Sequence, residues 1–238
     1  MIDKMVGKTE VALYGLAYSI GMLVQLFISG MNSALTPWMY SKIKKGDIRS
    51  MRKVLQLLSV VVVGIAVALM LISPELVLIF GSPKYREAVY VIPPVAASVF
   101  FIFIYNILSM PQFYYEKTQF LMAASMAAAG ANVVLNFIFI RLFGYIAAGY
   151  TTLACYMLYS VGHYIVSKRI LVNEGIQENL MSPGFLVACS VFLIGASIIC
   201  NLIFPYRILR YAILLASAGL VFWKKELLLK TMADIRKK

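Results

Sequence analysis

The chain has few acidic residues, few cysteines and little histidine. It contains 10 Asp and Glu residues against 22 Lys and Arg, with 3 cysteines and 1 histidine in 238 residues. Cys155, Cys189 and Cys200 show no CxxC or Cys/His spacing, so neither a disulfide framework nor a metal site is predicted. His163 has no carboxylate or cysteine at helical spacing, and we expect a packed or interfacial histidine. We therefore expect no catalytic residue, no metal and no cofactor.

Two common sequence signals are also missing. Gly7-Lys8-Thr9 looks like the end of a phosphate-binding loop, but Ile2 stands where that loop requires its first glycine. Residues 1–4 lack the basic segment and short apolar run of a signal peptide. ATP hydrolysis by this chain is therefore not expected.

Long apolar runs are what the chain does have. Hydrophobic residues make up 62% of it and charged residues 13%, against roughly 45–50% and 25% in soluble domains. A bilayer core of about 30 Å needs about 20 apolar residues per helix. We predict an all-α, multi-pass membrane helix bundle with seven spans, at residues 11–36, 54–80, 88–109, 120–140, 145–167, 185–204 and 208–223.

The positive charge is placed unevenly between these runs. The net charge of +12 would suggest nucleic acid in a soluble chain, but here alternate loops hold most of it. One side has 15 of the 22 basic residues: Lys42, Lys44, Lys45, Arg49, Arg52, Lys53, Lys117, Lys168, Arg169, Lys224, Lys225, Lys230, Arg236, Lys237 and Lys238. The positive-inside rule places this side and the C-terminus in the cytoplasm, and no nucleic-acid partner is expected.

The longest connections are expected at residues 40–53 and 168–183, both on the basic side. Residues 42–53 combine basic side chains with Ile43, Ile48 and Met51. This stretch either lies on anionic headgroups or forms a solvated tether.

A polar stripe follows the first run in steps of three, four and seven residues. Its members are Tyr14, Tyr18, Gly21, Gln25, Ser29, Asn32 and Thr36. On one straight helix they fall within an arc of about 80°. The stripe either lines an aqueous cavity, where amides and hydroxyls suit sugar hydroxyls, or packs against other helices.

Prolines and one acid interrupt the other runs. Pro74, Pro93 and Pro94 are candidate hinges, because a proline inside a helix removes a backbone hydrogen bond; a static kink is the alternative. Glu75 is the one acid well inside an apolar run. It is either a functional carboxylate or an outer-leaflet group that reaches toward water.

Two carboxamides lie in the fourth run. Asn132 and Asn136 must find partners on a neighbouring helix or face water, because lipid offers them no hydrogen bond. Ala124 and Ala128 share a helix face with Asn132, and small residues four apart permit close helix packing. We predict that this face packs against another helix.

Several motifs occur in the order seen in one known family. Residues 132–137, 143–149 and 151–156 resemble a motif late in the second lobe of polysaccharide repeat-unit flippases. These flippases belong to the multidrug, oligosaccharidyl-lipid and polysaccharide exporter superfamily. Residues 3–7, 78–81, 91–94 and 113–118 resemble further landmarks of the same family.

The resemblance implies two six-helix lobes and two extra helices that alternate their access to either side of the membrane. It assigns residues 1–167 to a second-lobe bundle that lacks its first helix, and residues 168–238 to the two additional helices and a basic cytoplasmic tail. We expect a C-terminal half whose partner is a missing N-terminal half, in the inner membrane of a bacterium. The expected ligands are lipid-linked oligosaccharide and membrane lipids. We expect the stripe to help line the cavity, and Glu75 and the kink at Pro74 to lie nearer its outer mouth.

Three other functions remain open. A drug or cation antiporter of the same superfamily would more often carry a carboxylate deep in the bilayer. A membrane enzyme of the same pathway would need paired carboxylates, or a histidine with an acid, on a sizeable loop, and the loops here are too short and too basic, so no enzyme is expected. A non-transporting remnant is the third.

Overall fold

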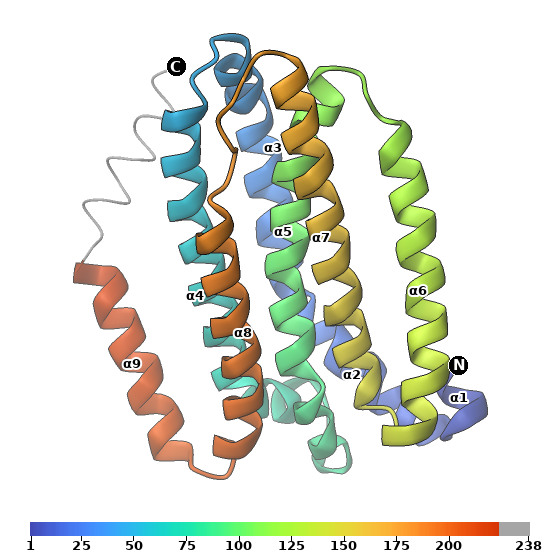
Figure 1. Cartoon of the computed structure of the whole chain (residues 1–238). Coiled ribbons are helices and arrows are strands. Elements are labelled where there is room, and N and C mark those ends of the chain that lie inside the picture. Colours follow the sequence, from blue (N-terminus) through green and yellow to red (C-terminus); the bar gives the residue numbers. More distant parts are fainter. Residues whose placement is uncertain (224–238) are drawn as a thin grey trace.

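The computed structural model of the chain describes residues 1–223. These residues form helices joined by short connections, with no strand among them, so the predicted all-α membrane bundle is confirmed. The longer helices run side by side (Figure 1). In chain order the elements are α1 (Ile2–Met5), α2 (Lys8–Gly21), α3 (Leu23–Lys44), α4 (Ile48–Phe80), the 3-10 helix η1 (Pro83–Tyr90), α5 (Ile92–Tyr114), α6 (Gln119–Phe143), α7 (Ala147–Asn173), α8 (Pro183–Ile203) and α9 (Arg207–Trp223). The predicted tail, from residue 224 onward, lies outside the described residues.

Five helical runs in the described part of the chain are long and apolar enough to cross a bilayer. They are Lys8–Lys44, which joins α2 and α3, Ile48–Phe80, Ile92–Tyr114, Gln119–Phe143 and Pro183–Ile203. These runs coincide with five of the seven predicted spans. The other two predictions fall on α7, which is long but less apolar, and on α9, which has 17 residues. At 1.5 Å per residue, α9 is about 25 Å long, less than the hydrocarbon core of a typical bilayer.

The central helix of the bundle is α5. Helices α2, α3, α4, α7 and α8 all pack against it. Every side chain from residue 92 to residue 104 is buried, including the rings of Phe100 and Phe103. Because α5 is enclosed by protein on most sides, residues that it presents to a neighbour lie inside the bundle.

The first predicted span is not one straight helix, which corrects the expectation of a continuous polar stripe. The chain breaks at Met22, between α2 and α3. Gly21 lies against α5 there, and a Cβ atom at Gly21 would come within 2.6 Å of the Val95 Cγ1 atom. The missing side chain lets α2 cross close to the start of α5. The stripe is therefore divided between two helices.

The prolines act differently from the prediction. Pro93 and Pro94 occupy the first turn of α5, where a proline costs no hydrogen bond, so they begin this helix and do not interrupt it. Pro74 does lie inside α4, and the Ser73 hydroxyl donates to the Met70 carbonyl at 2.8 Å. That carbonyl is the one that Pro74 leaves without a backbone donor.

The basic connections gather at one end of the bundle. Figure 1 shows the α3–α4, α5–α6 and α7–α8 connections at the same end, opposite η1 and the N-terminus. The connection predicted at residues 40–53 is mostly helical, because α3 extends to Lys44 and α4 begins at Ile48. Ile43, Ile48 and Met51 are buried in the core. They anchor this end of the bundle and do not face headgroups.

Candidate functional site

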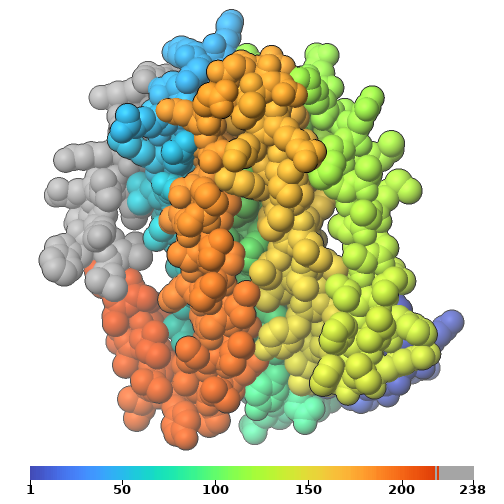
Figure 2. Space-filling view, viewed as in Figure 1, coloured from blue at the N-terminus to red at the C-terminus, as the bar shows by residue number. Residues whose placement is uncertain are grey.

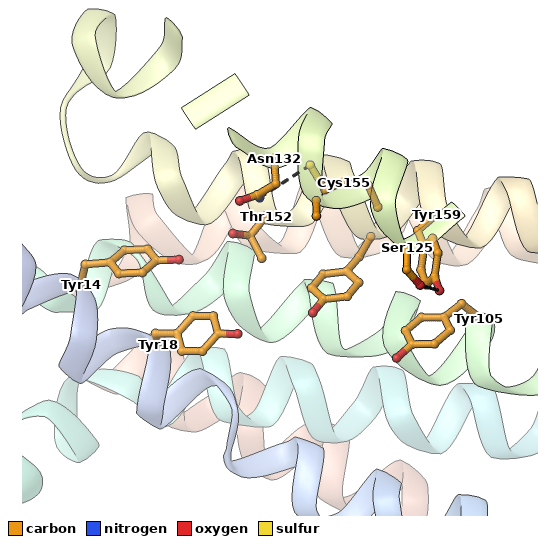
Figure 3. Close-up of a pocket in the computed structure, with 11 residues that line it drawn as sticks. Tyr14, Tyr18, Tyr105, Ser125, Asn132, Thr152, Cys155 and Tyr159 are labelled. Atoms are coloured by element: carbon orange, nitrogen blue, oxygen red, sulfur yellow. Dashed lines mark hydrogen bonds between the residues drawn. The ribbon is translucent and has the colours of Figure 1, made fainter. Parts of the chain in front are cut away.

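A cleft of about 510 Å³ lies between α2, α5, α6 and α7. Five of its lining residues are tyrosines, and none of the described residues that line it carries a charge. Figure 3 shows Tyr14 and Tyr18 pointing from α2 into the space, with Tyr105 pointing back toward them from α5. The polar lining residues are Tyr14, Tyr18, Tyr105, Tyr156, Tyr159, Ser125, Asn132 and Thr152.

Tyr14 and Tyr18 are the members of the predicted stripe that line this cleft. They lie one helical turn apart on α2, and their rings stack with centroids 5.8 Å apart. Both side chains are half-buried. The two rings form one aromatic wall of the cleft, with hydroxyl groups available to a polar ligand.

Sequence reasoning missed the tyrosines on the facing wall. The ring of Tyr105 on α5 lies 4.7 Å from that of Tyr159 and 6.3 Å from that of Tyr156, both on α7. Tyr156 and Tyr159 are three residues apart in an apolar run, which is a spacing that places two rings on one helix face. That signal was present, but only the fold shows that α5 and α7 present these rings to the same space.

The seam between α6 and α7 carries a chain of polar contacts. The Asn136 Nδ2 atom donates to Asn132 Oδ1 at 2.8 Å, and the Thr151 hydroxyl donates to Asn136 Oδ1 at 2.6 Å. The Asn132 amide also donates to the Cys155 Sγ atom at 3.6 Å. Both carboxamides therefore face α7, and Asn132 also lines the cleft.

The alanine face of α6 does not pack closely against α7 along its whole length. Ala128 lines the cleft, and both Ala124 and Ala128 line a second cavity of about 460 Å³ between the two helices. Ile140 is the one described side chain of α6 that is fully buried. In Figure 2, α7 and α8 occupy the middle of the face shown, and α6 forms its edge.

The remaining stripe residues lie on α3 and are not part of the cleft. Ser29 is exposed, while the Thr36 hydroxyl donates to the Asn32 backbone carbonyl at 2.8 Å and lies 3.8 Å from the Met110 sulfur. Gln25 Oε1 and Asn32 Oδ1 are buried and have no hydrogen-bond partner among the described residues. A substrate role for these four residues stays a prediction.

Glu75 lies outside the cleft and joins α4 to α9. Its carboxylate accepts two hydrogen bonds of 2.8 Å from the Arg210 guanidinium and one of 3.0 Å from the Tyr211 hydroxyl. Arg210 Nη1 also donates to the Leu71 carbonyl at 2.6 Å, next to the helix turn that Pro74 disturbs. A role at the outer mouth of a cavity remains a prediction for Glu75 and Pro74.

His163 on α7 is fully buried, next to two of the tyrosines that line the cleft. The Gln112 Nε2 atom lies 2.8 Å from His163 Nδ1 and also donates to the Leu108 carbonyl at 3.3 Å. Because an amide nitrogen can only donate hydrogen bonds, His163 Nδ1 is the acceptor in this contact. The rings of Tyr105 and Tyr159 pack on this imidazole, with centroids 5.8 and 4.5 Å away.

Comparison with known proteins agrees with a membrane transporter. The model of the MatE family matches residues 1–138, from the N-terminus into α6. No curated protein and no solved structure matches the chain. The match covers more than half of the 238 residues. The chain therefore belongs to the MatE family of membrane transporters, within the superfamily that the sequence resembles.

Proposed function

We propose that the chain belongs to a transporter that flips lipid-linked oligosaccharide repeat units across the membrane. The exported glycan would be an O-antigen, a capsule or an exopolysaccharide. The reaction is translocation by alternating access, without covalent chemistry. The observation that carries the proposal is the cleft, which combines five tyrosines with hydroxyl and amide groups and no charge among its described lining residues.

This lining suits a sugar in two ways. The apolar faces of sugar rings pack on aromatic rings, and Tyr14, Tyr18 and Tyr105 present such rings from two sides of the cleft. Sugar hydroxyls need donors and acceptors, which Asn132, Thr152 and the tyrosine hydroxyls provide. A volume of about 510 Å³ is in the usual range for a small-molecule site.

A drug or cation antiporter is the second candidate, because tyrosine rings also attract organic cations. The same lining favours it less, since a coupled cation site in a membrane usually includes a carboxylate. Glu75, the acid within the long apolar run of α4, is paired with Arg210 outside the cleft.

We place the protein in the inner membrane of a bacterium, with the basic end of the bundle in the cytoplasm. The support is the charge of that end. Lys44, Lys45, Arg49 and Lys53 are exposed next to the short α3–α4 turn, and Lys168 and Arg169 are exposed near the end of α7. This distribution follows the positive-inside rule.

Deletion of the chain in its source cell separates the two candidates. A flippase mutant should lose surface glycan and accumulate lipid-linked repeat units that a membrane-impermeant glycosidase cannot reach in intact spheroplasts. Its efflux of cationic dyes should be unchanged. Normal surface glycan with dye accumulation above the parent strain would reject the flippase in favour of the antiporter.

A further inference from the structure

A smaller cavity, of about 170 Å³, lies between α5, α7 and α8 on another side of the bundle from the cleft. The buried side chains of Phe100, Phe101 and Ile104 on α5 line it from the inside. Val161 on α7 and Val187 on α8 also line it and are 55% and 61% exposed. The cavity is therefore an apolar groove that opens to the surroundings of the bundle, and we refer to it as the α7–α8 groove.

Two basic residues lie at the end of this groove that points toward the basic end of the bundle. Tyr164 lines the groove, and the exposed Lys168 lies one helical turn further along the same face of α7. Arg52 reaches the same place from α4. Its Nε atom donates to the Asn179 carbonyl at 2.7 Å, four residues before Pro183 of the groove lining, and its charge acts on the Tyr164 hydroxyl.

Both cations are available to an anion. Neither Arg52 nor Lys168 forms an ion pair with a described residue, and no described residue accepts a hydrogen bond from the Nη atoms of Arg52. Glu178, in the adjoining connection, is exposed and pairs with neither of them. The two predicted spans 54–80 and 145–167 stop one or two residues short of these side chains. Arg52 and Lys168 therefore lie at the level of the lipid headgroups.

The connection between α7 and α8 is held in place beside the groove. Figure 1 shows it running part of the way down the bundle before α8 begins. Leu180 and Met181, just before α8, are buried in the core. Since the Asn179 carbonyl also binds Arg52, the guanidinium has a fixed position next to the groove.

We propose that an anionic phospholipid of the surrounding leaflet binds at this place, with its phosphate at Arg52, Lys168 and the Tyr164 hydroxyl and one acyl chain in the α7–α8 groove. Arginine, lysine and a phenol hydroxyl are suitable donors for phosphate oxygens. The apolar lining buries the chain. The bound lipid joins α4 to α7 across the connection that precedes α8. The proposal does not depend on which substrate the transporter carries.

Charge favours an anionic lipid over the other occupants of such a groove. The net charge of the chain is +12, so a second copy would bring like charge toward Arg52 and Lys168. A zwitterionic lipid would bring the positive part of its headgroup to the same two cations. The groove is smaller than the roughly 300–1,000 Å³ of most small-molecule sites, which suits one hydrocarbon chain of a larger ligand.

Native mass spectrometry of the full chain in a neutral detergent tests the proposal. The probes are phosphatidylglycerol and phosphatidylcholine with identical oleoyl chains. The parent protein should bind phosphatidylglycerol about tenfold more tightly, because each base near an anionic headgroup adds to the affinity. The double variant Arg52→Gln and Lys168→Gln should lose this preference. The control, Lys53→Gln with Arg169→Gln, removes the same charge from exposed neighbouring positions and should keep it.

A second pair of variants tests the acyl chain, because Arg52→Gln also removes the hydrogen bond to Asn179. Ser190→Phe places a ring in the groove, whereas Ala188→Phe places one on an exposed part of α8 that does not line it. Ser190→Phe should weaken the binding of phosphatidylglycerol about tenfold, equivalent to about two methylene groups left unburied. Ala188→Phe should not change it.

Equal affinities of the parent protein for the two lipids would overturn the proposal. Equal losses in the two charge variants would also overturn it, because general attraction to the basic end would then explain the binding. If Ser190→Phe binds phosphatidylglycerol as the parent does, the acyl chain does not lie in the groove and the assignment is wrong. A dimer that forms in the parent and not in Ser190→Phe would give the groove to a second copy and reject the lipid. The proposed transport function stands under all four results.

Discussion

The Arg210 guanidinium on α9 donates two hydrogen bonds of 2.8 Å to the Glu75 carboxylate on α4. The Arg210 side chain is 4% exposed and that of Glu75 is 26% exposed, so the pair is largely removed from water. The same guanidinium binds the Leu71 carbonyl. A short helix is thus fastened to a long one by a fork-shaped contact that a lysine could not reproduce.

Replacement of Arg210 by alanine should therefore release α9. Removing one partner of a buried ion pair leaves the other charge uncompensated, at a cost of about 3 kcal/mol here, the low end of the usual range because Glu75 is partly exposed. Unfolding in mixed micelles measures the loss. Arg207→Ala is the control, since Arg207 is exposed and one turn away. Equal stabilities for the two variants would mean that the Arg210–Glu75 ion pair does not hold α9 to α4.

Gly21→Ala should weaken the packing of α2 on α5. The new Cβ atom would lie 2.6 Å from Val95 Cγ1, and such overpacking typically costs about 1–3 kcal/mol. Gly15→Ala, where nothing lies within 4 Å, should instead leave stability unchanged or raise it by up to about 1 kcal/mol. Both changes are read from unfolding curves. A harmless Gly21→Ala would mean that α2 does not cross α5 this closely.

The Asn136–Thr151 contact should be worth about 0.6–1.7 kcal/mol, as measured for other interhelical hydrogen bonds in membranes. A double-mutant cycle with Asn136→Leu and Thr151→Val isolates this coupling energy. The same cycle with Asn136→Leu and the exposed Val134→Ala should give no coupling. A coupling energy below the experimental error in the first cycle would mean that the Asn136 and Thr151 side chains are not in contact.

The Asp47 carboxylate should make stability depend on pH in acid. It accepts a hydrogen bond from Lys42 Nζ and another from the Ser50 backbone amide, and these contacts hold its pKa below the ordinary value of 3.8. A lowered folded-state pKa stabilises the protein above pH 3.8, and this contribution disappears as pH falls through the folded-state pKa. Asp47→Asn should be less stable than the parent at neutral pH and equally stable in strong acid. If the two proteins differ in stability by the same amount in strong acid as at neutral pH, the ionised Asp47 carboxylate is not the source of the difference.

The fold class was predictable because long uncharged runs leave the backbone only helical structure in a bilayer. The break at Met22 was not, because it depends on Val95 of α5 meeting Gly21. Pro93 and Pro94 were placed inside a span because the apolar run begins before the helix does.

In the candidate site, too, the features that depend on contacts between helices could not be predicted from the sequence. Tyr14 and Tyr18 were predicted from spacing on one helix, which is local information. Tyr105 and Tyr159 join them through contacts between helices that no periodicity reveals. The Glu75–Arg210 pair is likewise separated by 135 residues, although each is a charged residue within an apolar run.

The most direct test of the sugar-binding cleft is surface glycan display in a strain that carries Tyr14→Ala and Tyr18→Ala at the chromosomal locus. The exposed Tyr206→Ala is the control. We expect at least a tenfold loss of surface glycan in the double variant, with protein levels equal to the parent, and no loss in the control. Full glycan display by a double variant present at normal levels would contradict the central claim.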